Sequence, residues 1–136
     1  MNPFHYSFNV HDLASTRRFY RELLGCAEGR SAATWVDFDF FGNQISAHLG
    51  EPARTADTGQ VDGIAVPMPH FGAVIGWAEL HALARRLEAA AVPFVLSPRV
   101  RYPGEPAEQA VFFVRDPSGN ALEMKAFKDP RHVFTP

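Results

Sequence analysis

The stretch FFVRDPSGNALE, which runs from Phe112 to Glu123, decides the fold that we expect. The segment 116–120 consists of Asp, Pro, Ser, Gly and Asn, which all favour tight turns. One apolar run precedes this segment and a second follows it. The sequence therefore predicts strands over 110–115 and 121–127 that are joined by this turn. Alternation along the second strand places Glu123 opposite its apolar neighbours, so its carboxylate is expected on a polar sheet face.

An earlier part of the chain repeats this arrangement. Gly42-Asn43 precedes an expected strand over 44–49, as Gly119-Asn120 precedes the strand over 121–127. Alternating residues predict a strand over 4–10, and aromatic and β-branched residues predict another over 34–41. After the first of these strands, Asp12 can cap a helix whose apolar residues recur at helical spacing as far as Gly25.

The second half of the chain gives the same order of elements. A strand candidate covers 70–77, a stripe of Leu and Ala residues predicts a helix over 78–91, and a short strand over 94–96 precedes a loop over 97–108. The segment from Gly50 to Pro69 is rich in Gly, Pro, Thr, Asp and Ala. It is predicted to be a long connection, with room for a short edge strand around 63–66.

This repetition indicates an internal duplication. We expect an α+β fold in which two copies of a βαβββ module share one domain, 1–136. The expected parts are module 1 at about 4–50, a linker at about 51–69, module 2 at about 70–127, and a C-terminal tail at 128–136. His5 and His70 each stand at the start of a module.

The composition of the chain indicates a globular protein and argues against nucleic acid and membrane partners. With 136 residues, 46% of them apolar and 21% charged, the chain has the size and composition of one globular domain. Its net charge of −2, without a block of Lys or Arg, argues against nucleic acid or an anionic membrane as a partner. Cys26 is its only cysteine, which excludes an intrachain disulfide and fits a reducing compartment. The N-terminus lacks the pattern of a secretory signal, so we expect a cytoplasmic protein.

Strand alternation places four candidate side chains on polar sheet faces: His5, His48, His70 and Glu123. Two imidazoles and one carboxylate form a ligand set that binds a divalent metal and leaves coordination positions open. A single histidine on a strand is nevertheless more often exposed or hydrogen-bonded than a ligand. Glu123 could also face solvent on an edge strand, and Arg99, Arg101 and Tyr102 could be a solvated loop.

Three segments resemble the vicinal oxygen chelate superfamily, which includes glyoxalase I, extradiol dioxygenases and the bleomycin and fosfomycin resistance proteins. They are His5 followed by Asp12–Ser15 and Phe19-Tyr20, then His70-Phe71-Gly72, and above all the run 112–123. The resemblance implies paired βαβββ modules in an open, barrel-like mixed sheet with helices on the outside. It also implies His5, His70 and Glu123 as the ligands of one divalent metal, and a homodimer.

One position separates the branches of this superfamily. Glyoxalase I usually has a fourth protein ligand in the last strand of the first module. Glu123 lies four residues after Gly119, and the residue four after Gly42 is Ser46. Serine is a poor ligand for a divalent metal and cannot act as a carboxylate base. The chain therefore looks closer to the extradiol dioxygenase branch, which implies Fe(II) or Mn(II), O₂ and a small bidentate oxygen substrate.

Further roles follow from this hypothesis. His48 is the candidate acid or base, with a hydrogen-bonded histidine that transfers no proton as the alternative. Ser46 and the loop residues Arg99, Arg101 and Tyr102 are candidates for binding the substrate. Two other functions stay open: a lyase or isomerase of the glyoxalase type with Zn(II) or Ni(II), and a non-enzymatic protein that binds a drug or metabolite.

Overall fold

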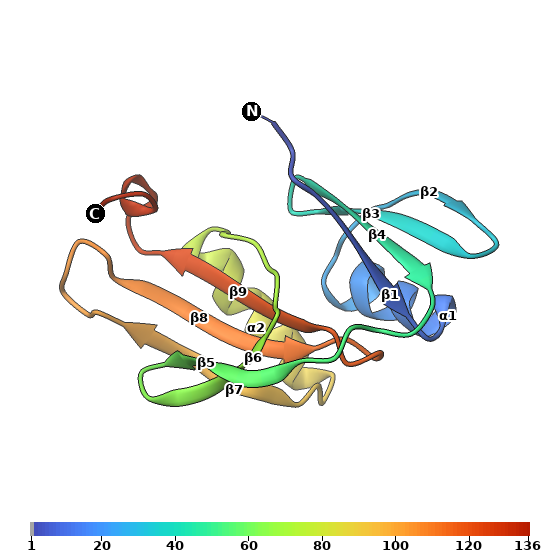
Figure 1. The fold of residues 1–136 in the computed structure, drawn as a ribbon. Coiled ribbons are helices and arrows are strands. Elements are labelled where there is room, and N and C mark those ends of the chain that lie inside the picture. Colours follow the sequence, from blue (N-terminus) through green and yellow to red (C-terminus); the bar gives the residue numbers. More distant parts are fainter. Residues whose placement is uncertain (1) are drawn as a thin grey trace. The chain divides into compact units, whose positions relative to one another are not determined.

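A computed structural model describes residues 2–136 of the chain (Figure 1). The order of elements in the first half is β1 (His5–Val10), α1 (Leu13–Arg17), the π-helical turn η1 (Arg18–Leu23), β2 (Glu28–Ala32), β3 (Trp35–Phe40) and β4 (Asn43–Leu49). The remaining elements are β5 (Ala56–Val61), β6 (Ile64–Met68), α2 (Trp77–Ala89), β7 (Phe94–Arg101), β8 (Gln109–Arg115), β9 (Ala121–Phe127) and the 3₁₀ turn η2 (Pro130–His132).

The described residues form two compact units. The first unit contains the chain up to Arg54 together with Asp116–Asn120, and the second contains Thr55–Arg115 and Ala121–Pro136. Within residues 2–136 the strands form three open sheets, one with the mixed order β1-β4-β3-β2, one of β5-β6 and one with the order β7-β8-β9. The α+β class predicted from the sequence is confirmed.

The sheet of the first unit has one apolar and one polar face. Strand β1 runs parallel to β4, and the other neighbours are antiparallel. The alternating apolar residues of β1, β3 and β4 are buried with η1, where the Tyr20 ring lies 5.4 Å from the ring of Phe38. The opposite face carries the polar members of the same alternation, which are His5, Ser7, Asn9, Asp37, Asp39, Gln44, Ser46 and His48.

The turn Asp116–Asn120 completes the first unit. The Asp116 side chain, 4% exposed, accepts hydrogen bonds from the Tyr20 hydroxyl at 2.9 Å, from the Ser118 and Asn120 amides at 2.9 Å each, and from Asn120 Nδ2 at 3.0 Å. Asn120 Nδ2 also donates to the backbone oxygen of Asn9 at 3.0 Å. Burial, and next the nearby Asp116 carboxylate, raise the pKa of Tyr20 well above its usual value.

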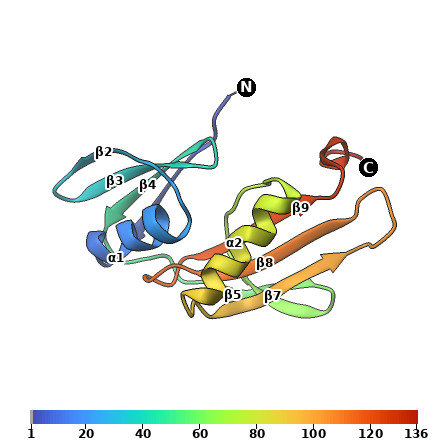
Figure 2. The same ribbon diagram turned by 180° about the vertical axis from the view of Figure 1, so that it is seen from behind.

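The sheet of the second unit packs against α2 on one side. Leu80, Leu83 and Leu87 of α2 are buried, and Figure 2 shows this helix lying along β8 and β9. The β5-β6 hairpin contributes Val61 and Val66 to a buried cluster that it shares with Leu96, Val111 and Phe113 of the three-stranded sheet.

Residues 70–77 do not form the continuous strand that we predicted. Only Phe71 and Val74 make bridges, parallel to Leu122 and Lys125 of β9, before α2 begins at Trp77. The approach to β9 is so close that a Cβ atom added to Gly72 would lie 1.5 Å from the backbone oxygen of Glu123. The second unit thus keeps the βαβββ order with its first strand reduced to two bridges.

Two other predicted segments differ in part from the structure. The short edge strand expected around 63–66 is present as β6, but the connection over 50–69 also contains β5, which pairs with β6 in a hairpin whose turn is formed by Asp62 and Gly63, with φ of 50° and 77°. The expected loop over 97–108 begins later, because β7 continues to Arg101 along β8. Register shifts between Phe94 and Arg99 let this strand accommodate Pro98, which cannot donate a ladder hydrogen bond. The sequence also did not distinguish β2.

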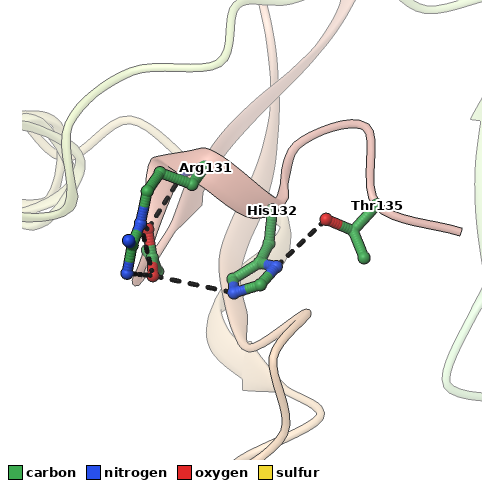
Figure 3. A network of polar contacts seen from close by, with 4 residues as sticks. Arg131, His132 and Thr135 are labelled. Carbon is green, nitrogen blue, oxygen red and sulfur yellow. Dashed lines mark hydrogen bonds and ion pairs between the residues drawn. The ribbon is translucent and has the colours of Figure 1, made fainter.

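The C-terminal tail folds into the short turn η2 around one carboxylate. Asp129 accepts hydrogen bonds from the Arg131 side chain, with the Nη2–Oδ2 pair at 2.7 Å, and its Oδ2 lies 3.6 Å from His132 Nε2 (Figure 3). The opposite ring nitrogen of His132 lies 3.0 Å from the Thr135 hydroxyl. The hydrogen bonds from Arg131 lower the pKa of Asp129 to about 2.

Among residues 2–136 no helix is both long enough and apolar enough to span a bilayer.

Candidate functional site

The two units place His5 and His70 at equivalent positions in their sheets. Tyr6 of β1 stands opposite Ile45 of β4, and Phe71 stands opposite Leu122 of β9, in parallel pairs. His5 and His70 each precede the first member of these pairs, and Ser46 and Glu123 each follow the second. The backbone register therefore agrees with the count from the two glycine turns, which matched Ser46 to Glu123.

His70 is held in one tautomer beside Glu123. Its Nδ1 atom lies 2.8 Å from the backbone oxygen of Pro67. Because a carbonyl oxygen only accepts, this contact requires the hydrogen on Nδ1, which leaves Nε2 of the neutral ring as the free electron-pair donor. Nε2 lies 3.5 Å from Glu123 Oε1, and the Phe113 ring packs edge-on against the imidazole at 4.9 Å.

This pair has the chemistry of two metal ligands. With metal–ligand bonds of about 2.1 Å, two donor atoms on one ion stand roughly 3 to 3.5 Å apart, and the His70–Glu123 pair has this separation. The Nδ1–carbonyl hydrogen bond is the usual support of a ligating imidazole. Lys125 Nζ lies 3.9 Å from the same Glu123 oxygen and balances its charge.

His5 is an exposed residue of the first unit, with Nε2 3.2 Å from the Ser7 hydroxyl. No group of three or more His, Cys, Asp or Glu side chains that could hold a metal ion occurs among the described residues 2–136. The structure thus brings together His70 and Glu123, while His5 as the third ligand stays a prediction.

Ser46 has a partner that the sequence analysis missed. It is buried, and its hydroxyl donates a 2.5 Å hydrogen bond to Oδ1 of Asp37, the residue opposite it in the β3-β4 register. Phe113 occupies the equivalent position opposite Glu123. The alternation of Val36-Asp37-Phe38-Asp39-Phe40 was the available signal, because it places Asp37 on the polar face.

His48 lies on the same face as Ser46 and is half-buried. Its ring stacks on Trp35, with centroids 6.2 Å apart and planes inclined by 27°. This contact orients the imidazole at the edge of the polar face. The acid or base role of His48 stays a prediction.

Arg99 and Arg101 lie on β7 and not in the loop that we predicted. Both pair with Asp62 of the β5-β6 turn, with Nε–carboxylate distances of 3.2 Å. Arg101 also donates to the Tyr102 hydroxyl at 2.9 Å and lies over that ring. Asp62 therefore joins the hairpin to β7, and the role of these three residues in binding a substrate stays a prediction.

The first unit also contains a cavity of about 360 Å³ on its polar face. Its lining includes Pro3, Arg30, Asp37, Asp39, Asn43 and Gln44. Gln44 stands opposite His5 in the β1-β4 register, so the cavity lies beside the predicted ligand His5.

Solved structures share this fold over nearly the whole chain. A glyoxalase/bleomycin resistance protein/dioxygenase from Alicyclobacillus acidocaldarius is 28% identical with a TM-score of 0.77, covering 98% of this chain and 96% of that one. A fosfomycin resistance protein from Listeria monocytogenes is 20% identical, with a TM-score of 0.65 and 93% of each chain covered. A lactoylglutathione lyase from Agrobacterium tumefaciens is also 20% identical, with a TM-score of 0.62 over 93% of this chain and 94% of that one.

No curated protein matches the sequence. The match to a family is nevertheless extensive, because residues 3–124 fit the Glyoxalase/Bleomycin resistance protein/Dioxygenase superfamily. The matched range includes His5, His70 and Glu123 together with the turn 116–120. On this match, and with the βαβββ order of both units, the chain belongs to the Glyoxalase/Bleomycin resistance protein/Dioxygenase superfamily.

Proposed function

We propose that this chain is a metal-dependent dioxygenase of the extradiol type, in which His5, His70 and Glu123 hold one Fe(II) or Mn(II) ion. The observation that carries the proposal is the His70–Glu123 pair, with the imidazole tautomer fixed by Pro67 and Nε2 directed to the carboxylate side. Such an ion supplies a Lewis acid and a redox centre, and a three-ligand set leaves positions for two substrate oxygens and O₂.

The chain's own residues would prepare this site. Pro67 fixes the proton of His70 on Nδ1, so that ring cannot accept a proton there while it donates to the carbonyl. The Phe113 ring packs against His70, with the two ring planes inclined by 79°, and restricts the orientation of the imidazole. In this proposal His48, oriented by Trp35, accepts the proton that a substrate hydroxyl releases on binding.

A second candidate is a lyase or isomerase of the glyoxalase type with Zn(II) or Ni(II). One observation favours it: Asp37, hydrogen-bonded to Ser46, brings a carboxylate to the first unit beside the position where serine replaces an acidic residue. A carboxylate there could accept a proton from a carbon acid. The first proposal needs O₂ and the second does not, so oxygen consumption separates them.

The metal proposal is tested by metal analysis of protein purified without added metal. We expect close to one Fe or Mn per chain, and a loss of bound metal in His5→Ala, His70→Ala and Glu123→Gln. His81→Ala is a matched control, because His81 Nδ1 also lies 2.8 Å from a backbone oxygen, that of Trp77. Wild-type protein without metal would refute the proposal and favour the non-enzymatic binder.

The reaction is tested by O₂ uptake with a panel of catechols, using the metal-loaded protein. Ring cleavage should consume one O₂ per catechol and give a yellow product absorbing at longer wavelength than the catechol. His48→Ala with unchanged metal content and unchanged turnover would remove the proposed role of His48. Turnover of a hemithioacetal without O₂ uptake would favour the lyase or isomerase.

We also propose that the chain forms a homodimer, in line with its superfamily. The tail supports this proposal, because Phe134 is 95% exposed next to a turn that is fixed by Asp129. Light scattering behind size exclusion should give twice the chain mass of 15.1 kDa. A mass of one chain at micromolar concentration would refute it.

A further inference from the structure

The geometry points to the cavity of the first unit as a subsite that selects a hydroxylated organic acid, with Arg30 binding the acid group and Asp37 binding a hydroxyl. This inference rests on the proposed function for its placement beside His5. It goes further in naming the class of substrate and two residues that recognise it.

Arg30 provides the group that would bind an anion. It stands in the bulge of β2, it lines the cavity, and its guanidinium carbon lies 6.0 Å from the centre of the Trp35 ring. Among residues 2–136 the ion pairs of the neighbouring arginines Arg17 and Arg21 go to Glu28, and none involves Arg30. A guanidinium that rests on an aromatic ring presents its hydrogen-bond donors at the edge, where a carboxylate can bind in a bidentate manner.

Asp37 provides the group that would bind a hydroxyl. One carboxylate oxygen, Oδ1, receives the hydrogen bond from buried Ser46, which fixes the plane of the carboxylate at the cavity wall. A carboxylate has lone pairs for about four hydrogen bonds, so Asp37 retains acceptors for a donor on the ligand.

Two other polar side chains of the cavity, those of Asp39 and Asn43, accept hydrogen bonds from the backbone. Asp39 Oδ1 accepts a 2.8 Å hydrogen bond from the Gly42 amide, and Asn43 Oδ1 accepts a 2.9 Å hydrogen bond from the Phe4 amide. These contacts hold the β3-β4 turn and the strand that leads to His5. Of the charged side chains in this lining, Asp39 supports the β3-β4 turn, whereas Asp37 is held by the buried Ser46 hydroxyl and Arg30 has no ion pair among residues 2–136, so we assign ligand recognition to Arg30 and Asp37.

The position of the cavity connects it to the proposed reaction. Gln44 lines the cavity and stands opposite His5 in the register, while Asp37 and Ser46 follow one step along the same face. Arg30 stands on β2, the neighbour of β3 in the sheet, so a ligand whose hydroxyl binds Asp37 would direct its acid group across to Arg30. A volume of about 360 Å³ accommodates a substituted single ring.

Three ligands that share a catechol ring test the inference: one carries an acid group, one an amine of similar size, and one no substituent. Calorimetry under anaerobic conditions would measure the binding of 3,4-dihydroxybenzoate, catechol and 3,4-dihydroxybenzylamine to the protein as purified with its metal. We expect the acid to bind about 10-fold to 100-fold more tightly than catechol, in the range of one charge-assisted hydrogen-bonded pair. Equal binding of acid and catechol, or tighter binding of the amine, would overturn the inference.

Matched variants assign the effect to the two residues. Arg30→Gln should abolish the preference for the acid, while Arg18→Gln, an exposed arginine of η1, should keep it. Asp37→Asn should weaken the binding of uncharged catechol by about 10-fold, while Asp57→Asn on β5 should not. A preference that survives in Arg30→Gln, or catechol binding unchanged in Asp37→Asn, would overturn the assignment.

The two proposals fail in distinguishable ways. Acid preference that depends on Arg30, in a protein that cleaves no ring and consumes no O₂, would refute the dioxygenase and leave the subsite intact. Ring cleavage of catechol and 3,4-dihydroxybenzoate at equal efficiency, with equal affinities, would support the dioxygenase and refute the subsite.

Discussion

Replacing Gly72 by alanine tests how the second unit positions His70. An added Cβ would lie 1.5 Å from the backbone oxygen of Glu123 and 2.6 Å from its carbonyl carbon. A carbon and a carbonyl oxygen in contact need about 3.3 Å, so the segment 71–74 and β9 must separate by almost 2 Å. Backbone atoms on both sides leave no flexible side chain that could absorb this shift.

The separation would break the two hydrogen bonds that flank Gly72. Glu123 N donates to Phe71 O at 2.9 Å, and Lys125 N donates to Ala73 O at 3.1 Å. Each is worth about 0.5–1.5 kcal/mol net, and lost packing adds to them, so we expect a destabilisation of about 2–4 kcal/mol. For a chain of this length that lowers the melting temperature by roughly 6–12 °C.

Urea and thermal unfolding, followed by circular dichroism, would measure this change. Gly76→Ala is the matched control in the same segment, because the nearest atoms to its added Cβ are those of Glu79 at 3.8 Å and beyond. Metal content should fall in Gly72→Ala and not in Gly76→Ala, since only the first moves His70 away from Glu123. Equal melting temperatures for the two variants would refute the reasoning.

Three more predictions concern carboxylates and one phenol. Asp116→Ala should lower the free energy of unfolding by about 3 kcal/mol, because the buried Tyr20 hydroxyl and Asn120 amides lose their acceptor. Urea unfolding would measure this change, and a decrease of less than about 1 kcal/mol would contradict the prediction. Burial raises the pKa of Tyr20, so its contribution to stability is complete below the unfolded pKa of about 10 and is lost as pH rises beyond it. Absorbance at 295 nm should show Tyr20 ionising only with unfolding, and a reversible titration of all three tyrosines in folded protein would disprove that. Hydrogen bonds from Arg131 lower the pKa of Asp129 to about 2. The tail turn should therefore be fully formed above the unfolded pKa of about 4 and should open as pH falls through about 2. The NMR shift of the Asp129 carboxyl carbon would follow this titration. A midpoint near 4 would count against the Arg131 contact.

The sequence predicted elements well where the side-chain period was clear. Alternation identified β1, β4 and β9, aromatic and β-branched residues identified β3, and an apolar run before a turn identified β8. The leucine stripe identified α2 within one to two residues at each end. The short edge strand expected around 63–66 corresponds to β6, but its partner β5 was missed because Ala56–Val61 is rich in small and polar residues and resembles a linker, although Asp62-Gly63 is a strong hairpin signal. The apolar spacing up to Gly25 predicted an ordinary helix and did not distinguish the π-helical turn η1.

Strand alternation predicted which side chains of the candidate site share a sheet face, but not all of the contacts between them. Strand alternation put His70 and Glu123 on polar faces, and the family resemblance implied that the two side chains lie together. Asp37 could not be joined to Ser46 in advance, because that contact depends on the alignment of β3 with β4 across the sheet. The pairing of Arg99 and Arg101 with Asp62 depends on the hairpin that was missed.

The turn Asp116–Asn120 gives the first unit an acceptor that the chain supplies only after its second unit has begun. A nascent chain that ends at Arg54 has made β1 to β4 and η1, yet Tyr20 then lacks the carboxylate that its buried hydroxyl needs. During synthesis, some sixty further residues must therefore be added before the buried Tyr20 hydroxyl can donate its hydrogen bond to Asp116. Cutting the gene between the two halves would not yield two self-sufficient proteins, because the border between the units in space is not a border along the chain.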